Sequence, residues 1–454
     1  MYDYDCIVIG AGPAGYEVAT LLGEAGKNVC IIEKAEGNVG GTCLNEGCVP
    51  AKNFLETSSY IKKAQYFEAC GVHAKESSFD ISALQNSTQC LICDLRIGIL
   101  NKLKKAKAEI KYASASFIDN HTVQLDNEDK ERVSAQDIII ASGSSHRDHP
   151  LLKLHSDKII SSREVFTLKD IPKSLLVIGG GAIGCEFASF YNALGCEVEI
   201  AEFAPSLVAM EDDDVSKTLK REFEKKGIKI YLSANVSSYN VDDDGVTVQI
   251  DLAKKSEEKT YDKVLISIGR IPNTSALALD NANIESDRGF IEVNENLQCV
   301  NHDNIYAIGD IVKSPALAHV AYYEAKRVAQ QILGKETLPA EYIFPSVTFC
   351  TPQIASIGKS EKALKESATA FKSKKLFFKS NAKAKIKGDD SGFIKVLFNE
   401  ENSAILGASI IGNDATELIH QFLIAINANL TLNDLEKMIF AHPTLSESTL
   451  DLIH

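Results

Sequence analysis

Two cysteines, Cys43 and Cys48, stand five positions apart in the segment Gly-Gly-Thr-Cys-Leu-Asn-Glu-Gly-Cys-Val-Pro-Ala-Lys. In a regular α-helix, this spacing places the two Cα atoms about 8 to 9 Å apart, whereas a disulfide needs roughly 4.4 to 6.8 Å. If the two thiols bond, a helix here must be distorted, and the neighbouring glycines and Pro50 allow it. A strained disulfide in a short loop is easily reduced, which suits catalysis. From the spacing alone, two unrelated buried thiols remain the alternative.

A second reactive pair lies near the C-terminus, where His442 begins the run His-Pro-Thr-Leu-Ser-Glu that ends at Glu447. A thiol of ordinary pKa is mostly protonated at neutral pH, so forming a thiolate benefits from a nearby imidazole. Glu447 can fix the tautomer and the orientation of that ring. An isolated histidine is more often structural. His442 and Glu447 are therefore candidates for an acid–base pair only if the folded protein brings them to the cysteines.

One strand–glycine–helix unit occurs twice in the chain. An apolar run at residues 6–9 leads into Gly-Ala-Gly-Pro-Ala-Gly, then into a helical segment to about residue 25 and a strand that ends at Glu33. A run at 175–178 leads into Gly-Gly-Gly-Ala-Ile-Gly, a helix and a strand that ends at Glu202. Each acid follows the first glycine of its copy by 23 positions. One such motif is weak evidence, but two in matching context predict two nucleotide sites.

The residue types of these units suit dinucleotide binding. The first glycine permits the tight turn, the second lets the backbone approach a pyrophosphate, and the third allows close packing of helix on strand. The helix N-terminus attracts the phosphates, and the acid accepts hydrogen bonds from a ribose diol. Glu202 would repel a 2′-phosphate, and residues 199–207 contain no arginine, so NAD is favoured over NADP. The candidate residues are Gly10, Gly12, Gly15 and Glu33 in the first unit and Gly179, Gly181, Gly184 and Glu202 in the second.

Composition restricts the class of protein. A chain of 454 residues with 45% apolar and 24% charged residues is an ordinary globular chain of several domains. Its net charge of −14 and the lack of a dense basic run make nucleic acid an unlikely partner. No apolar stretch is long enough to span a membrane, and the acidic N-terminus is unlike a secretory signal. We therefore expect a cytoplasmic protein, and its eleven scattered cysteines favour mostly reduced thiols.

Two further segments have clear periodicity. Between residues 84 and 111, apolar side chains at steps of three and four predict a long amphipathic helix; they are Ile92, Leu95, Ile99, Leu103, Ala106 and Ile110. Cys90 and Cys93 lie inside this helix, and no second Cys or His cluster accompanies them, so we expect neither a redox role nor a metal site for them.

From about residue 346, strands at 392–398 and 404–411 and helices at 414–428 and 432–440 predict an α+β terminal domain.

Residues 41–52 resemble the redox-active motif of the flavin-dependent pyridine nucleotide-disulfide oxidoreductases, and the resemblance extends over nearly the whole chain. Residues 10–16 are similar to the family's FAD fingerprint, 140–144 to the turn that closes its first FAD segment, and 269–273 to the end of its NAD domain. The resemblance implies an α/β protein with two Rossmann-like dinucleotide-binding domains plus a C-terminal α+β dimerisation domain. The expected domains are FAD-binding at 1–145, NAD-binding at 146–269, a central FAD-binding segment at 270–342, and dimerisation at 343–454.

The resemblance also implies roles for single residues. Cys43 exchanges with the substrate sulfur, Cys48 lies nearer the flavin as the charge-transfer thiolate, His442 shuttles the proton, and Glu447 orients it. In the family arrangement the histidine comes from the other subunit of a homodimer, and a cis peptide bond joins it to the proline that follows, here His442–Pro443. Lys52 lies near the flavin N5 in an ion pair with Glu186 beside the nicotinamide. Further implied cofactor contacts are Ser142, Gly143, Ser144, Gly269, Asp310, Leu317, Ala318 and His319.

Within the family, the dihydrolipoamide dehydrogenases have the most similar motifs. We therefore expect FAD-dependent oxidation of protein-bound dihydrolipoamide with reduction of NAD⁺. The lipoyl group would belong to another protein, of a 2-oxo acid dehydrogenase complex or a glycine cleavage system. Another NADH-dependent disulfide reductase is the alternative, and a non-catalytic flavin redox sensor is a further one. Phe440, Glu46 and the run Val49-Pro50-Ala51 depart from the family pattern and leave the disulfide substrate open.

Overall fold

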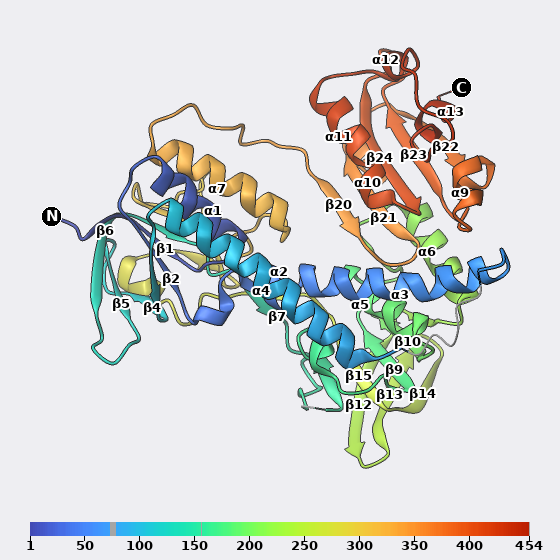
Figure 1. Cartoon of the computed structure of the whole chain (residues 1–454), viewed down its shortest axis with the longest axis horizontal. Coiled ribbons are helices and arrows are strands. Elements are labelled where there is room, and N and C mark those ends of the chain that lie inside the picture. Colours follow the sequence, from blue (N-terminus) through green and yellow to red (C-terminus); the bar gives the residue numbers. More distant parts are fainter. Residues whose placement is uncertain (73–78, 156, 454) are drawn as a thin grey trace. The chain divides into compact units, whose positions relative to one another are not determined.

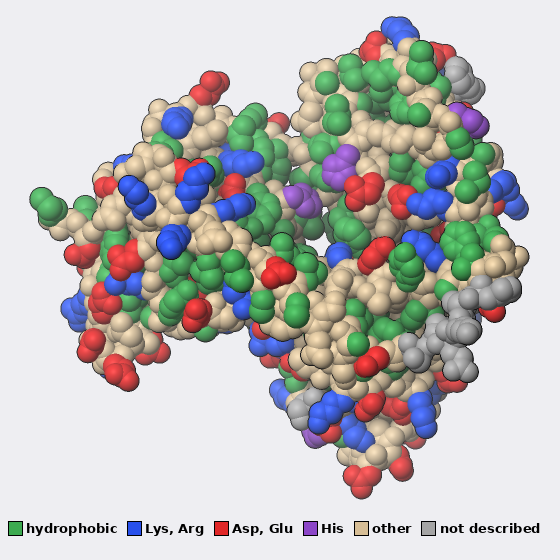
Figure 2. Space-filling view, in the orientation of Figure 1, with side chains coloured by type: hydrophobic (Ala, Val, Ile, Leu, Met, Phe, Trp, Pro, Cys, Tyr) green, Lys and Arg blue, Asp and Glu red, His purple; other side chains and the backbone are tan. Residues whose placement is uncertain are grey.

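The computed structural model describes residues 1–72, 79–155 and 157–453 (Figure 1). The chain forms two compact units, each built from three separate stretches of sequence. The first unit comprises Met1–Pro50, Gln85–Arg147 and Arg270–Tyr342. The second comprises Ala51–Leu84, Asp148–Gly269 and Ile343–His454. Acidic side chains are interspersed with Lys and Arg over the visible surface of both units (Figure 2). The chain has 62 acidic and 48 basic residues, which gives the net charge of −14.

The first unit is organised by a mostly parallel sheet with the order β3-β2-β1-β6-β5-β4, in which β19 also pairs with β6. The five parallel strands are β3 (Glu109–Tyr112), β2 (Val29–Glu33), β1 (Tyr4–Ile9), β6 (Arg132–Ile140) and β19 (Ile305–Ala307). The antiparallel strands are β4 (Ala115–Phe117) and β5 (Thr122–Leu125). Of the parallel strands, β1, β2 and β19 are mostly apolar and buried on both faces, as is typical of the inner strands of a parallel sheet, whereas β3 is partly exposed. The carboxyl ends of the parallel strands meet at one edge, so the segments after β1, β2, β6 and β19 gather there.

Helices α1 (Pro13–Glu24) and α7 (Ala318–Ile332) pack along each other in this unit (Figure 1). The predicted long helix is present as α4 (Ile81–Lys105), but its expected C-terminal part is wrong. Lys107 has a left-handed backbone with φ +58°, and Ile110 lies in β3, where it pairs with β2. Leu95, expected in the core, is 44% exposed. The buried stripe is therefore narrower than the periodicity suggested.

The second unit repeats the strand–glycine–helix arrangement in a parallel sheet with the order β11-β10-β9-β15-β8. Its strands are β8 (Ile159–Ser161), β9 (Ser174–Ile178), β10 (Glu197–Glu202), β11 (Lys229–Leu232) and β15 (Lys263–Ile266). Its helices are α5 (Ala182–Ala193) and α6 (Asp213–Lys225). An antiparallel sheet follows, of β12 (Asn235–Asp242), β13 (Gly245–Leu252) and β14 (Lys255–Tyr261). Both predicted dinucleotide-type folds are thus confirmed.

The C-terminal part of the second unit is an antiparallel sheet with the order β20-β21-β24-β23-β22. Its strands are β20 (Pro345–Thr348), β21 (Gln353–Gly358), β22 (Lys372–Phe377), β23 (Phe393–Phe398) and β24 (Ile405–Gly412). Its helices are α8 (Glu361–Glu366), α9 (Ala382–Ile386), α10 (Ala415–Leu418), α11 (His420–Asn427), α12 (Leu432–Leu435) and α13 (Ser448–Asp451). This confirms the α+β domain. The expected helix at 432–440 ends at Leu435, because the apolar side chains beyond it, Met438 and Ile439, are exposed and gain no burial that would extend it.

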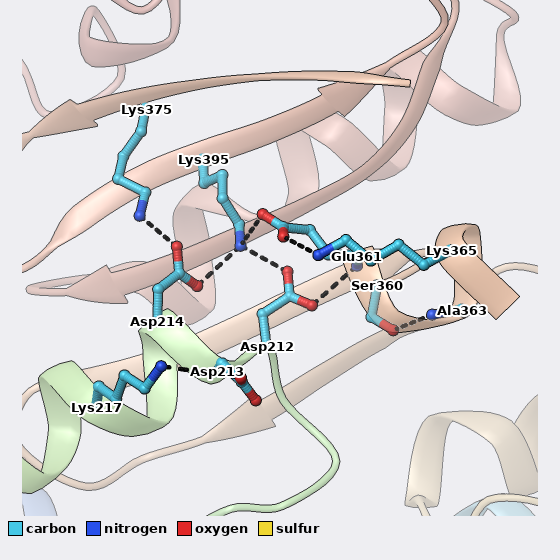
Figure 3. A network of polar contacts seen from close by, with 10 residues as sticks. All are labelled: Asp212, Asp213, Asp214, Lys217, Ser360, Glu361, Ala363, Lys365, Lys375 and Lys395. Carbon is cyan, nitrogen blue, oxygen red and sulfur yellow. Dashed lines mark hydrogen bonds and ion pairs between the residues drawn. The ribbon is translucent and has the colours of Figure 1, made fainter. Parts of the chain in front are cut away.

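A buried lysine joins this sheet to α6 (Figure 3). Lys395, on β23, has a side chain that is 1% exposed, and its Nζ lies 2.7 Å from Asp212, 2.8 Å from Asp214 and 3.2 Å from Glu361. Burial opposes the charge, but hydrogen bonds and attraction from Asp212 and Asp214 outweigh it and raise the pKa of Lys395. One cation therefore neutralises carboxylates from the N-terminal ends of α6 and α8.

Replacing this lysine should destabilise the second unit. Lys395→Ala leaves Asp212, whose side chain is 3% exposed, buried without its cation, so we expect the free energy of unfolding to fall by about 3 to 5 kcal/mol. Lys217→Ala is the matched control, because Lys217 is 79% exposed and pairs with Asp213 at 3.9 Å, where a loss below about 0.5 kcal/mol is expected. Urea denaturation measures both. Equal losses in the two variants would contradict the role of the buried cation.

Candidate redox and dinucleotide site

The two cysteines lie on either side of a helix break. Cys43 is in α2 (Gly41–Asn45), and Cys48 is the first residue of α3 (Cys48–Glu68). A Cβ atom at Gly47 would lie 2.9 Å from Thr42 O and 3.5 Å from the Cα atom of Cys43. The chain after the break therefore returns against the turn of helix that carries Cys43. A bond between the two sulfurs requires the helix to be interrupted, because a regular helix holds residues five positions apart too far from each other.

The same turn packs against the first glycine motif. Gly41 has φ +62°, and a Cβ atom there would lie 2.6 Å from the Cα atom of Gly12. Cβ atoms in real proteins almost never come this close to another heavy atom. The backbone of residue 41 can therefore pack on the backbone of Gly12 only because residue 41 is a glycine. Within the first unit, the segment that carries Cys43 is thus adjacent to the start of α1.

Asn45, between the two cysteines, ties this segment together. Its Nδ2 donates to Asn38 O at 3.1 Å, Val39 O at 3.3 Å and Gly41 O at 2.8 Å. Its Oδ1 accepts a hydrogen bond of 2.5 Å from Arg96 Nη2 on α4. Sequence reasoning missed both residues. Asn45 could have been suspected from its place between the cysteines, whereas no local signal pointed to Arg96.

The first glycine turn has the geometry of a dinucleotide cradle. Gly10 has φ +103°, and a side chain at Gly15 would collide with Gly10 O, so α1 lies directly on the turn. Glu33 is 7% exposed and accepts a hydrogen bond of 2.8 Å from Ala11 N. Burial raises the pKa of Glu33, and the N–H groups of Ala11 and Lys34 act against that shift. An added Cβ atom at Gly12 would lie in van der Waals contact with Gly41 Cα, at 3.9 Å, and would have no other neighbour within 4 Å, so no side chain blocks the approach of a pyrophosphate to this backbone.

The second turn repeats these features. Gly179 has φ +107°, and a side chain at Gly184 would collide with Gly179 O. Glu202 accepts hydrogen bonds from Gly180 N and, at 2.6 Å, from Ala204 N. No atom lies within 4 Å of an added Cβ at Gly181, the residue that precedes α5. The open space over the start of α5 fits a second pyrophosphate.

Other predicted cofactor contacts lie at the carboxyl edge of the first sheet. Ser142 and Gly143 (φ +67°) follow β6, and Ser144 opens β7 (Ser144–His146), which pairs with β16 (Arg270–Pro272). Ser144 Oγ donates to Asp310 Oδ2 and accepts from Arg270 Nε at 2.7 Å. These contacts bring Asp310 beside the turn after β6. Leu317, Ala318 and His319 form the start of α7, and Gly269 (φ +111°) precedes β16.

The expected ion pair of Lys52 and Glu186 is present in the second unit. Lys52 Nζ is 2.9 Å from both carboxylate oxygens of Glu186, whose side chain is 6% exposed. Glu186 also accepts a hydrogen bond of 2.9 Å from Phe349 N. Lys52 on α3 and Glu186 on α5 are thus held together by side-chain and main-chain donors.

His442 and Glu447 form a pair in the same unit. His442 Nδ1 is 2.8 Å from Glu447 Oε2, the His442 side chain is 74% exposed, and Glu447 is 14% exposed. The predicted cis peptide His442–Pro443 is present. Because a carboxylate facing Nδ1 favours the proton there, Nε2 is the nitrogen free to accept one. The pair can therefore act as a carboxylate-oriented base at an exposed position.

Asn381 holds the segment that carries this pair. It is 2% exposed, and its Nδ2 donates to Thr444 O at 3.0 Å and to Ser448 Oγ at 2.9 Å. Thr444 Oγ1 in turn accepts a hydrogen bond of 3.2 Å from Glu447 N. Sequence reasoning missed Asn381, because its local pattern indicates only a helix cap, which it also provides for α9.

Comparison with known proteins gives the family of this chain. The pyridine nucleotide-disulphide oxidoreductase model matches residues 4–325, and the dimerisation domain model of the same family matches residues 344–453. This chain belongs to the pyridine nucleotide-disulphide oxidoreductases. The dihydrolipoyl dehydrogenases of Chlamydia muridarum, Geobacillus stearothermophilus and Staphylococcus aureus are each 36% identical to it over 98% of this chain and 95% of theirs.

Two solved structures have the same fold as this chain. The HOCl-induced flavoprotein disulfide reductase RclA from Escherichia coli, in its Cu(II) complex, has a TM-score of 0.89 and 26% identity, with 100% of this chain and 99% of that chain covered. LpdA from Mycobacterium tuberculosis has a TM-score of 0.90 and 24% identity over 99% and 98% of the two chains, which shows the fold alone. Among residues 1–72, 79–155 and 157–453, no helix is long and apolar enough to span a membrane. That described part also contains no cluster of three His, Cys, Asp or Glu side chains fit for a metal.

The open space at Gly181 predicts a selective effect on pyridine nucleotide binding. Gly181→Ala places a methyl group where the pyrophosphate would lie, so affinity for NADH should fall by roughly tenfold or more without loss of folding. Gly184→Ala should instead disrupt the turn, because its methyl group collides with Gly179 O. Titration of NADH fluorescence measures the affinity, and Gly98→Ala on α4, which also meets open space, is the control. Unchanged NADH affinity in Gly181→Ala would contradict this site.

Proposed function

We propose that this chain is a dihydrolipoyl dehydrogenase that oxidises a protein-bound dihydrolipoyl group and reduces NAD⁺, with FAD between the two. The observation that carries the proposal is the close packing of the Cys43 turn on Gly12, in a chain that also has a second dinucleotide fold and the pair of His442 and Glu447. The 36% identity to dihydrolipoyl dehydrogenases over 98% of the chain supports this substrate class.

The chain's own residues account for the thiol chemistry. In the oxidised enzyme, Cys43 and Cys48 form a disulfide. One substrate thiolate attacks Cys43 Sγ, the bond between the cysteines breaks, and Cys48 leaves as a thiolate. The second substrate thiolate then attacks the substrate sulfur of the mixed disulfide, which closes the lipoyl ring and releases the Cys43 thiolate. His442 accepts the proton of each attacking thiol through Nε2, while Glu447 holds the ring; the first proton passes on to solvent, to which His442 is 74% exposed, and the second stays on the imidazole.

The proposed cofactor sites follow the geometry of the two turns. Bound FAD would supply a two-electron carrier between the cysteine couple and NAD⁺. Residues 1–145 and 270–342 would bind FAD, 146–269 NAD, and 343–454 would form the dimer. The proposed FAD contacts are Gly10, Gly12, Gly15, Glu33, Lys52, Ser142, Gly143, Ser144, Asp310, Leu317, Ala318 and His319. The proposed NAD contacts are Gly179, Gly181, Gly184, Glu186, Glu202 and Gly269.

Anaerobic titration of the holoenzyme with dihydrolipoamide tests the proposal. Two electrons per flavin should produce a long-wavelength charge-transfer band, because Cys48 becomes a thiolate beside the flavin. Cys48→Ser should abolish the band and reduce lipoamide turnover by at least about 10²-fold. Cys90→Ser is the control, since Cys90 is an exposed cysteine on α4. Flavin bleaching without the band, or full turnover in Cys48→Ser, would refute the dithiol mechanism.

A disulfide reductase that acts on another substrate is the second candidate. The likeness to RclA at 26% identity favours it, as do the departures at Glu46 and Phe440. Comparing lipoamide with glutathione disulfide as electron acceptor for NADH separates the two enzymes. A chain that reduces neither leaves two alternatives, a reductase of a different disulfide and a non-catalytic flavin redox sensor.

Mixed dimers test whether the site is shared between subunits. Cys43→Ser and His442→Ala should each be inactive as pure dimers. If His442 of one subunit serves the cysteines of the other, random reassociation of the two variants restores about a quarter of wild-type activity, because half of the dimers are mixed and each has one intact site. Activity is measured after co-refolding, with each variant refolded alone as the control. No recovery in verified mixed dimers would place both groups of a site in one subunit.

A further inference from the structure

A phenylalanine of the C-terminal domain contacts both members of the Lys52–Glu186 ion pair. The centroid of the Phe349 ring lies 4.7 Å from Lys52 Nζ. The main-chain N–H of the same residue donates to Glu186 Oε1 at 2.9 Å. One residue thus interacts with the cation through its ring and with the anion through its backbone.

The position of Phe349 is itself well fixed. It directly follows β20, and its ring packs against the hydrophobic cluster that includes the buried face of α5. Thr351 N donates to Ser189 Oγ at 3.1 Å, and Lys226 Nζ donates to Thr351 O. Glu186 and Ser189 are three residues apart on α5, so they lie on one face of the helix. The segment 349–351 is therefore fastened to this face at two points.

These contacts restrict a side chain that is mobile by nature. A lysine ammonium sits on a flexible stem and can direct its three donors in many ways. Glu186 attracts Lys52 Nζ equally with both oxygens, at 2.9 Å each. The aromatic face adds a second attraction and shields part of the ammonium, since the Lys52 side chain is 33% exposed.

We propose that Phe349 is a positioning residue for hydride transfer, because it holds the ion pair of Lys52 and Glu186, to which the proposed function gives contacts with the flavin and the nicotinamide. The inference rests on the proposed function, in which a hydride passes between NADH and the flavin beside this ion pair. It gives the C-terminal domain a part in that step in addition to dimer formation. Phe349 should affect electron exchange with NADH and leave exchange with the dithiol unchanged.

The two half-reactions are measured separately by anaerobic stopped-flow on the holoenzyme. In Phe349→Leu, flavin reduction by NADH should slow by about three- to tenfold, as expected for loss of one cation–π contact. Flavin reduction by dihydrolipoamide should keep its wild-type rate. Phe349→Tyr retains the aromatic face and should restore the NADH rate. Phe349→Met, which fills a similar volume without a ring, serves if the leucine variant does not fold.

Phe166→Leu is the matched control. Phe166 packs against the same hydrophobic cluster as Phe349, and its ring contacts Phe54 and Phe187, with centroid distances of 5.2 and 5.7 Å. Equal slowing of both half-reactions, the same effect in Phe166→Leu, or no effect in Phe349→Leu would overturn the inference. Failure of dihydrolipoamide to reduce the wild-type flavin would refute the proposed function instead, and the NADH measurement would still test Phe349.

Discussion

The close approach of backbone to backbone around the cysteine motif is the constraint on which the rest of the first unit depends. Gly41 meets Gly12, and Gly47 meets the turn at Cys43, at distances that a side chain would prevent. These contacts place the cysteines against the start of α1, where the dinucleotide turn lies. The glycines thus bring the segment of Cys43 and the first glycine turn into one region, and the parallel sheet determines where that region lies, because its carboxyl edge carries Gly10, Glu33 and Asp310.

Paired charges organise the second unit in a comparable way. Lys395 is buried with Asp212, Asp214 and Glu361, and it joins the C-terminal sheet to α6. The pair of Lys52 and Glu186 joins α3 to α5. A buried charge without a partner is costly, so each ion pair requires its two elements to stay together. The first pair supports the architecture, whereas the second is available for chemistry because Lys52 remains partly exposed.

Much of the fold and of the candidate site could be predicted from local patterns. The two glycine motifs with their acids and the terminal α+β domain followed from such patterns, whereas the ion pair of Lys52 and Glu186 was expected from the family resemblance. The predictions that failed were those that depended on distant contacts. Ile110 continued the helical periodicity, yet it lies in β3 because pairing with β2 satisfies its backbone. Leu95 fitted the apolar stripe, yet it is 44% exposed.

The sequence alone determined the chemistry available to this protein, because residue type and spacing decide which groups can exchange electrons, cradle a phosphate or accept a proton. Only the tertiary structure decided which residues support those groups. Arg96 reaches Asn45 across 51 positions, Asn381 reaches Thr444 across 63, and Phe349 reaches Glu186 across 163. Such contacts arise when helices and strands pack and bring together side chains that are far apart in the sequence. A local sequence pattern does not predict them. Glycines, cysteines and histidines can be recognised as functional candidates from their residue type and spacing. A supporting residue such as Asn381 can be recognised only from the side chains and main-chain groups that it contacts in the folded protein.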